Sequence, residues 1–332
     1  MRTTARLIVA CGLLAAPAFC LAAGVAGSRA VEVAATAANG RAKPAKPSKK
    51  AGEPVVPIAW RQHLQAARSE AARRGVCVLV YFRADWCGPC RLMEKGNFLM
   101  PAVAQFINRH FIPLKVDDSD APSNVTKTYE IRVYPSILFL DPGGKPLHLI
   151  LGPRVPERFY RVMQQVKEVP VLMARQHAHP DSLEANFGLG NALAKLNHLR
   201  RAAPYLEKAA DLDPQNADGR LSQARLILAV VPLEEGRSKE ALANLDAWLQ
   251  EFADDPEAPV AVWYQGTILY QDGRLAEAKR CFRKILDRFP KHAKAYEAEK
   301  AIAHIDARLR AREVEKHRGK DYNQEKEPEP EG

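Results

Sequence analysis

The pentapeptide Trp86-Cys87-Gly88-Pro89-Cys90 restricts the fold of this sequence more than any other feature. It follows directly after residues 76–82, a run of apolar residues that is typical of a strand buried on both faces. Two residues separate the cysteines, so on the first turn of a helix their sulfur atoms can reach disulfide distance. Pro89 suits that turn because its missing N–H group would have no partner there. The sequence therefore predicts a buried strand that runs into a helix whose first turn carries a cysteine pair.

The two cysteines are expected to be redox-active and to differ in role. Unpaired N–H groups give the start of a helix partial positive charge, which stabilises a thiolate there. Cys87 stands nearest to that end and is the predicted nucleophile, whereas Cys90, one turn further in, would resolve the mixed disulfide. Half of a zinc site is the alternative for such a pair, but it needs two further ligands, and no second pair with this spacing occurs in the sequence. We therefore expect a dithiol and no metal.

Residues 57–168 are expected to form one small α/β domain. Gly75 would end the first helix, and Asp141-Pro142-Gly143-Gly144 has the composition of a hairpin turn. The expected helices cover residues 58–74, the segment from the cysteines to about residue 108, and residues 157–167, and the expected strands cover 76–82, 111–116, 137–140 and 147–151.

These residues resemble the thioredoxin family. The pentapeptide after a buried strand is similar to the family's redox motif, and Tyr134-Pro135-Ser136 before a strand is similar to its cis-proline loop. The resemblance implies the α/β thioredoxin fold, in which helices flank a central mixed sheet, and a cis peptide between Tyr134 and Pro135 beside the sulfurs. It also implies Trp86 and Pro135 as site residues and a substrate strand laid against Tyr134. The redox group would be the Cys87–Cys90 disulfide itself, with no cofactor.

One position departs from the family pattern. Thioredoxins usually have a buried aspartate six residues before the first cysteine, where it assists proton transfer, and Tyr81 stands there in this sequence. Glu94 is a candidate replacement as the acid–base group, because residues 87, 90 and 94 lie on one face of a helix. The alternative is that Glu94 pairs with Arg91, Lys95 or solvent at the side of the helix, and the sequence leaves both open. The stretch 86–98 also resembles the thioredoxin-like output domain of membrane disulfide reductases.

Residues 169–310 are expected to form an all-α domain of repeats. Three small or helix-ending residues recur at the same spacing in two segments, namely Gly190, Ala202 and Pro214, and Gly266, Ala278 and Pro290. This helix–turn–helix pattern resembles the tetratricopeptide repeat, in which small residues let two helices approach closely. A longer third unit fits between the two segments, and a capping helix would follow them. Residues 311–332 alternate acidic and basic residues and are predicted to be a disordered charged tail.

Repeat arrays of this kind bind other chains on a concave face lined by the first helix of each repeat. The alignment places six side chains on that face: Phe187, Asn191, Lys195, Trp263, Thr267 and Tyr270. Aromatic side chains are typical binding anchors. The alternative is that Phe187 and Trp263 belong to the core between the helices.

The N-terminal residues carry the pattern of an export signal. Arg2 and Arg6 precede an uncharged, mildly apolar stretch over residues 7–27. We expect a signal peptide or a retained N-terminal anchor over residues 1–26, and both stay open because a stretch of this length can also span a bilayer. Residues 27–56 are rich in Ala, Lys and Pro and are expected to be a disordered linker. The chain would then be exported to a bacterial periplasm, either soluble or anchored.

The positive charge of the chain does not predict a nucleic-acid partner. The formal net charge is +10, but residues 41–50 hold five positive charges, and no recognition motif accompanies them. Hydrophobic residues make up 47% and charged residues 27% of the chain, a balance that excludes a wholly disordered protein and a multi-pass membrane protein.

Together these features predict an exported protein thiol–disulfide oxidoreductase. The Gly-Pro pair between the cysteines resembles the reducing branch of the thioredoxin family, so a reductase is expected. Its partners would be disulfide-containing protein substrates, a membrane electron donor, which an oxidising compartment makes necessary, and a protein bound on the repeat groove. The alternative is a redox-linked chaperone or assembly scaffold, in which the repeats bind clients and the redox activity is secondary.

Overall fold

The computed structural model describes residues 56–324. The predicted signal peptide or anchor, nearly all of the predicted linker and the last part of the predicted tail lie outside the described residues. Within residues 56–324, no helix is both long enough and apolar enough to cross a membrane.

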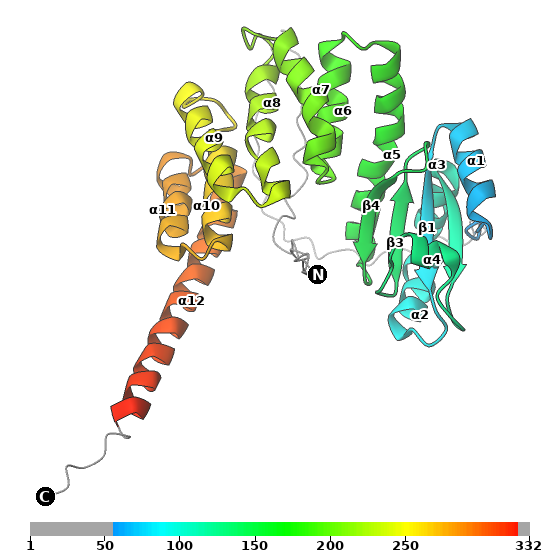
Figure 1. Cartoon of the computed structure of the whole chain (residues 1–332), viewed down its shortest axis with the longest axis horizontal. Coiled ribbons are helices and arrows are strands. Elements are labelled where there is room, and N and C mark those ends of the chain that lie inside the picture. Colours follow the sequence, from blue (N-terminus) through cyan, green and yellow to red (C-terminus); the bar gives the residue numbers. More distant parts are fainter. Residues whose placement is uncertain (1–55, 325–332) are drawn as a thin grey trace, which may run out of the picture. The chain divides into compact units, whose positions relative to one another are not determined.

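The first half of the described chain forms a four-stranded mixed sheet with helices on both faces (Figure 1). The strands lie in the order β2-β1-β3-β4, where β1 pairs in parallel with β2 and antiparallel with β3, and β3 pairs antiparallel with β4. The strands are β1 Cys77–Arg83, β2 Phe111–Asp117, β3 Ser136–Leu140 and β4 Pro146–Leu151. The helices of this half are α1 Leu64–Arg74, α2 Gly88–Lys95, the 3-10 helix η1 Asn97–Leu99, α3 Pro101–His110, α4 Asn124–Thr128 and α5 Pro156–Ala178. This is the thioredoxin fold that the resemblance implied.

Strand β1 is buried on both faces, as its sequence predicted. Val78 and Val80 point into one core, which α1 covers, whereas Leu79 and Tyr81 point into the other, to which α2, α3 and α5 contribute. Because β1 and β2 run in parallel, their carboxyl ends meet at the same edge of the sheet. The cysteine pair follows β1 at that edge.

The chain passes from β1 into α2 as the pentapeptide predicted. Cys87 is the N-cap of α2 and Pro89 stands in its first turn. The single helical segment expected up to about residue 108 is instead divided into α2, η1 and α3, which corrects that prediction. Pro101 explains the division, because proline favours the first turn of a new helix and keeps the residue before it out of the helical conformation.

Helix α5 is longer than the sequence predicted. It continues through Pro170 to Ala178, so it crosses the predicted domain boundary between residues 168 and 169. Pro170 has no N–H to donate to the carbonyl of Val166, one turn earlier in the helix. The thiol of buried Cys77 lies 4.0 Å from that carbonyl oxygen and donates to it. The helix therefore tolerates Pro170 because a side chain of β1 satisfies part of the lost hydrogen bonding.

The second half of the described chain is helical throughout. Its elements are α6 Leu183–Lys195, α7 Leu199–Leu212, α8 Arg220–Ala229, the 3-10 helix η2 Val231–Glu235, α9 Ser238–Glu251, α10 Ala258–Gln271, α11 Leu275–Arg288 and α12 Ala293–Gln324. The extra length of the middle unit is taken up by η2, which stands between α8 and α9. The predicted close approach of paired helices is present, since a Cβ on Gly190 would lie 2.6 Å from Leu206, and one on Gly266 would lie 2.6 Å from Phe282.

Helix α12 continues beyond the predicted start of the charged tail. The sequence predicted disorder from residue 311, whereas the helix runs to Gln324. Residues 311–324 contain no proline and are rich in Arg, Glu and Lys, which have high helix propensity, so the segment can extend the helix without a core of its own.

Candidate active site

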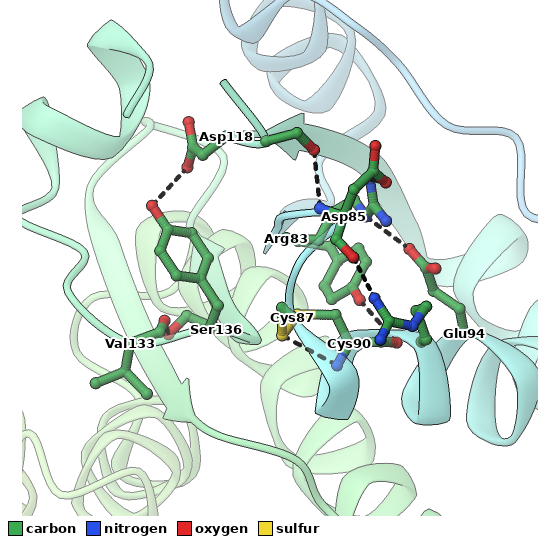
Figure 2. Close-up of a disulfide and its surroundings, with 12 residues drawn as sticks. Arg83, Asp85, Cys87, Cys90, Glu94, Asp118, Val133 and Ser136 are labelled. Atoms are coloured by element: carbon green, nitrogen blue, oxygen red, sulfur yellow. Dashed lines mark hydrogen bonds and ion pairs between the residues drawn. A yellow bond between two sulfur atoms is a disulfide. The ribbon is translucent and has the colours of Figure 1, made fainter. Parts of the chain in front are cut away.

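Cys87 and Cys90 form a disulfide at the N-terminus of α2 (Figure 2). Their Cα atoms are 5.3 Å apart. The backbone N–H of Cys90 donates to the sulfur of Cys87 over 3.1 Å, so the helix terminus directs a donor at that sulfur. Cys90 is completely buried and Cys87 is 4% exposed, so Cys87 is the sulfur nearer to the surface. The arrangement suits a thiolate on Cys87 more than on Cys90.

The peptide bond between Tyr134 and Pro135 is cis, as the thioredoxin resemblance implied. Gly152, directly after β4, holds this loop in place, because its N–H donates to the carbonyl of Pro135 over 2.8 Å. The side chain of Tyr134 packs against the cluster that contains both cysteines. The cis-proline loop therefore stands beside the disulfide.

Two exposed apolar side chains flank the disulfide. Trp86 is 65% exposed, and its ring meets the ring of Tyr134 edge-on with centroids 5.5 Å apart. Val133, from the cis-proline loop, is 44% exposed. Side chains of this kind can contact an extended polypeptide laid across the sulfurs.

A buried carboxylate that the sequence analysis missed fixes Tyr134. The hydroxyl of Tyr134 donates to Oδ2 of Asp118 over 3.0 Å, and Thr126 donates to the same oxygen over 2.5 Å. Asp118 is 3% exposed and also accepts the backbone N–H of Ser123. Burial, followed by the hydrogen bond to Asp118, raises the pKa of Tyr134 to about 12, so the hydroxyl stays protonated at neutral pH. The signal in the sequence is that Asp118 directly follows β2, whose carboxyl end lies beside that of β1.

Tyr81 occupies the place of the family's buried aspartate. Its side chain is completely buried, and its hydroxyl donates to the backbone carbonyl of Cys90 over 3.4 Å. Burial, and next the charge of Glu94, raise the pKa of this phenol well above its ordinary range. Tyr81 is therefore a neutral donor under the second cysteine, not an acid–base group that titrates near neutral pH.

Glu94 pairs with a residue that the sequence analysis did not consider. Its Oε1 lies 3.1 Å from Nε of Arg83, so its partner is neither Arg91 nor Lys95 (Figure 2). Arg91 instead donates to the backbone carbonyl of Asp85. Nothing in the sequence marks Arg83 as buried, because an arginine at the end of a strand is usually solvated.

The six predicted groove residues differ widely in exposure. Phe187 and Thr267 are buried, and Phe187 lies in a hydrophobic core cluster. Trp263 is partly buried and packs on Phe282, with ring centroids 4.9 Å apart. The other three, Asn191, Lys195 and Tyr270, are partly or fully exposed.

Cations from the following helices cover several of these aromatic rings. The guanidinium of Arg220 lies 4.6 Å from the centre of the Phe187 ring, and the ammonium of Lys294 lies 4.6 Å from the centre of the Trp263 ring. The hydroxyl of Tyr270 is 2.9 Å from Nε2 of His304 and accepts a hydrogen bond from Arg308 over 3.1 Å. Aromatic and basic side chains therefore meet in the seam between α10 and α12, where Lys294 is also paired with Glu297 over 2.7 Å.

The surroundings of the other two cysteines of residues 56–324, Cys77 and Cys281, do not favour a thiolate. Cys77 is buried in β1, and burial raises the pKa of its thiol well above the ordinary value. Burial also raises the pKa of the Cys281 thiol, which is partly exposed on α11. In the same part of the chain, no three His, Cys, Asp or Glu side chains lie together as a metal site.

Comparisons with known proteins agree with this division of the chain. Residues 59–142 match a family model described as thioredoxin-like, and residues 183–216 and 260–292 match two tetratricopeptide-repeat models. The two repeat matches contain the segments that the aligned glycines and prolines predicted. The chain therefore combines a thioredoxin-like domain with tetratricopeptide repeats.

Curated relatives match parts of the chain. Thiol:disulfide interchange protein DsbD 1 of Pseudomonas aeruginosa is 32% identical over 105 residues, which is 30% of this chain and 18% of the relative. Thioredoxin H-type of Populus jackii is 28% identical over 111 residues, which is 33% of this chain and 73% of the relative. DnaJ homolog subfamily C member 3 of Rattus norvegicus is 30% identical over 142 residues, which is 42% of this chain and 27% of the relative. The chain thus spans less than a third of the length of the first and the third of these proteins.

Proposed function

We propose that the protein is an exported thiol–disulfide reductase that acts on protein substrates. The observation that carries the proposal is the Cys87–Cys90 disulfide at the N-terminus of α2, beside a cis-proline loop and an exposed tryptophan. In the reduced protein, the Cys87 thiolate attacks a substrate disulfide, forms a mixed disulfide and releases one substrate sulfur as a thiolate. Cys90, once deprotonated, then attacks the sulfur of Cys87. The second substrate sulfur leaves, and both electrons of the dithiol have passed to the substrate.

The division of roles between the cysteines rests on their surroundings. The sulfur of Cys87 accepts a hydrogen bond from the N–H of Cys90 and stands at the positive end of α2, so its thiolate is stabilised. Cys90 is completely buried, so a large substrate cannot reach it directly. Trp86, Val133 and Tyr134 supply apolar and aromatic contacts for an extended substrate segment next to the sulfurs.

The reducing direction and the cellular place are parts of the same proposal. Gly-Pro between the cysteines, as in thioredoxins, supports reduction, and the N-terminal sequence pattern supports export to a periplasm. An exported reductase needs electrons from across the membrane, since the compartment is oxidising. The similarity to a relative named as a thiol:disulfide interchange protein supports thiol–disulfide exchange as the way in which these electrons arrive.

Trapping of substrates tests the mechanism. The variant Cys90→Ser, in a Cys281→Ser background, should accumulate mixed disulfides through Cys87 that dithiothreitol releases. The matched control is Cys87→Ser with Cys90→Ser, which should trap nothing. The unaltered chain should reduce insulin with a thiol donor, and both active-site variants should lose this activity. Absence of trapped substrates together with absence of insulin reduction would contradict the proposal.

The repeats would bind the protein partner. Helices α8 and α10 carry no acidic residue, and the exposed side of the seam between α10 and α12 presents Tyr270, His304 and Arg308. The basic side chains on this exposed side favour an acidic segment of the partner. Substituting both His304 and Arg308 by Glu in the Cys90→Ser chain should lower the yield of trapped substrates. The same pair of substitutions in a chain with both active-site cysteines should leave insulin reduction unchanged.

A redox-linked chaperone is the second candidate, and exposed apolar side chains of the thioredoxin-like domain favour it. Leu92 and Leu99 are 74% and 60% exposed on α2 and η1, in addition to Trp86 and Val133. The test compares suppression of aggregation by the unaltered chain and by Cys87→Ser with Cys90→Ser. If the double variant keeps full biological function, the repeats and this apolar surface act without the dithiol, and the reductase proposal is wrong.

A further inference from the structure

Arg83 is a buried cation shared by three carboxylates from three parts of the chain. It ends β1, four residues before Cys87, and its side chain is 10% exposed. Its guanidinium lies 3.1 Å from Glu94 of α2, 2.6 Å from Asp85 in the loop before Cys87, and in contact with Asp117 at the end of β2. Figure 2 shows Arg83, Asp85 and Glu94 gathered beside the helix that begins at the disulfide.

The charge of Arg83 is maintained by these carboxylates. Burial alone would lower its pKa, but hydrogen bonds to Asp117 and Asp85 and the charge of Glu94 raise it, so the guanidinium stays charged. Burying a cation is costly unless opposite charges are held against it. Glu94, the least exposed of the three carboxylates, is therefore the partner best placed to offset this cost.

The cluster reaches the redox helix through Glu94. Glu94 stands on the same helix as Cys90, and its contact with Arg83 is an ion pair without hydrogen-bond alignment, since neither atom has a hydrogen-bond partner in the described part of the chain. The charge of Glu94 is also felt by Tyr81, whose hydroxyl donates to the carbonyl of Cys90. Arg83, Glu94, Tyr81 and the backbone of Cys90 thus form a connected set under the disulfide.

We propose that Arg83 is a positioning residue of the dithiol site: it holds Glu94 at the side of α2 and balances its negative charge, so that the Cys87 thiolate does not form beside unpaired carboxylates. The inference rests on the proposed dithiol chemistry and concerns its regulation by charge. It reassigns Glu94, which the sequence suggested as a proton donor, to one half of an ion pair. Arg83 touches neither substrate nor sulfur in this role and acts through Glu94 and α2.

The expected size of the effect follows from distance and charge. Four residues of chain span at most about 14 Å, so the Cα atom of Arg83 lies within that distance of the Cα atom of Cys87. One unit charge at roughly 10 Å, with an effective dielectric constant of about 20, changes the pKa of a thiol by about one unit. Removing Arg83 should raise the pKa of Cys87, because three carboxylates lose their shared cation. Removing the charge of Glu94 should lower it, because Arg83 then has one anion fewer to balance.

The experiment measures the ionisation of Cys87 in the reduced full chain. In a Cys281→Ser background, the variants are Arg83→Met, Arg83→Lys, Glu94→Gln and the combination of Arg83→Met with Glu94→Gln. Alkylation of Cys87, followed by mass spectrometry of the peptide that contains it, gives the titration midpoint from its dependence on pH and the rate from its value at neutral pH. Equilibration with glutathione adds the reduction potential.

The two single changes should act in opposite directions. Arg83→Met should raise the midpoint by about one pH unit and slow alkylation up to about tenfold, whereas Glu94→Gln should lower the midpoint. The titration midpoint of the combined variant should lie nearer to that of the unaltered chain than the midpoint of Arg83→Met does. The midpoint of Arg83→Lys should lie between those of the unaltered chain and of Arg83→Met. Lysine keeps the positive charge but lacks the planar guanidinium that can contact several carboxylates. Arg83→Met should also make the dithiol more reducing, since its reduced form gains less from the thiolate.

A matched control separates charge from structure. Arg61 pairs with Glu70 in the same domain, with 2.7 Å between the charged atoms, and Arg61→Met should leave the midpoint unchanged. Shifts of the same sign in Arg83→Met and Glu94→Gln, or an equal shift in Arg61→Met, would overturn the inference while the reductase proposal stands. If Arg83→Met does not fold, Arg83→Lys and Glu94→Gln decide by the same criterion. An unaltered chain whose reduced Cys87 is unreactive would overturn the proposed function, and this inference with it.

Discussion

At the scale of single residues, the candidate active site depends on side chains whose positions are fixed by neighbouring residues. Tyr134 precedes the cis-proline, and its ring is contacted by Trp86 while its hydroxyl is bound by Asp118. Asp118 itself is buried and receives further donors from the loop after β2. The surface next to the sulfurs is thus fixed by a carboxylate that does not itself contact the disulfide in any described hydrogen bond.

Removing the hydroxyl of Tyr134 should therefore loosen the substrate surface. Tyr134→Phe leaves the buried carboxylate of Asp118 with one donor fewer, which should cost about 1–3 kcal/mol of the free energy of unfolding. We expect kcat/KM for a disulfide-containing protein to fall, while alkylation of Cys87 by a small reagent stays the same. The control is Tyr296→Phe, at a ring that is 64% exposed. Equal effects of the two substitutions on kcat/KM would refute this role for Asp118.

At the scale of elements, the two aligned glycines set the distance between paired helices. A Cβ on Gly266 of α10 would meet Cε1 of Phe282 at 2.6 Å and Cζ at 2.9 Å, and Phe282 is itself buried on α11. A Cβ on Gly188 of α6 would meet only one terminal methyl of Leu172, at 3.2 Å. The same substitution thus has different consequences at these two helical positions.

Gly266→Ala should destabilise the repeats, whereas Gly188→Ala should have little effect. Alanine favours a helix by up to about 1 kcal/mol over glycine. At Gly266 the overpacking of a buried ring should outweigh this gain, for a net loss of about 1–2 kcal/mol. Urea unfolding followed by helical circular dichroism measures both variants. A Gly266→Ala variant as stable as Gly188→Ala would show that α10 and α11 can move apart at little cost.

The sequence could predict those features that depend on local spacing. The pentapeptide, the cis-proline loop and the aligned glycines are each encoded within a few residues, and the strand, the turn into α2 and the paired helices follow from them. Arg83 could not be predicted in this way, because its burial depends on carboxylates from β2 and α2. The continuation of α5 through Pro170 depends likewise on Cys77, which is distant in the sequence.

At the scale of the whole described chain, side-chain contacts tie the hairpin of β3 and β4 to the start of α7. Arg201 donates to the buried carboxylate of Asp141 and to the carbonyl of Pro146, each over 3.1 Å. The ring of His198, just before α7, contacts the carbonyl of Leu147. Together with the continuous helix α5, these contacts make the sheet domain and the first repeat dependent on each other for stability.

His148 of β4 lies at this junction and makes it sensitive to acid. Burial, followed by the charge of His198, lowers the pKa of His148 to about 4, and the charge of Arg154 acts in the same direction. In the unfolded chain its pKa is about 6.5. The folded chain therefore binds fewer protons between these two values, so stability is complete above about pH 6.5 and is lost as the pH falls towards about 4.

The acid sensitivity of this junction can be measured as the slope of the free energy of unfolding against pH. The free energy of unfolding should fall by up to about 3 kcal/mol between about pH 6.5 and 4, since each pKa unit corresponds to about 1.4 kcal/mol. His148→Gln cannot take up the proton, so its free energy of unfolding should change less over this range, whatever its absolute stability. His177→Gln, at an exposed position of α5, is the control and should keep the slope of the unaltered chain. If His148→Gln keeps the full slope, other groups carry the acid sensitivity, and the junction does not depend on a neutral His148.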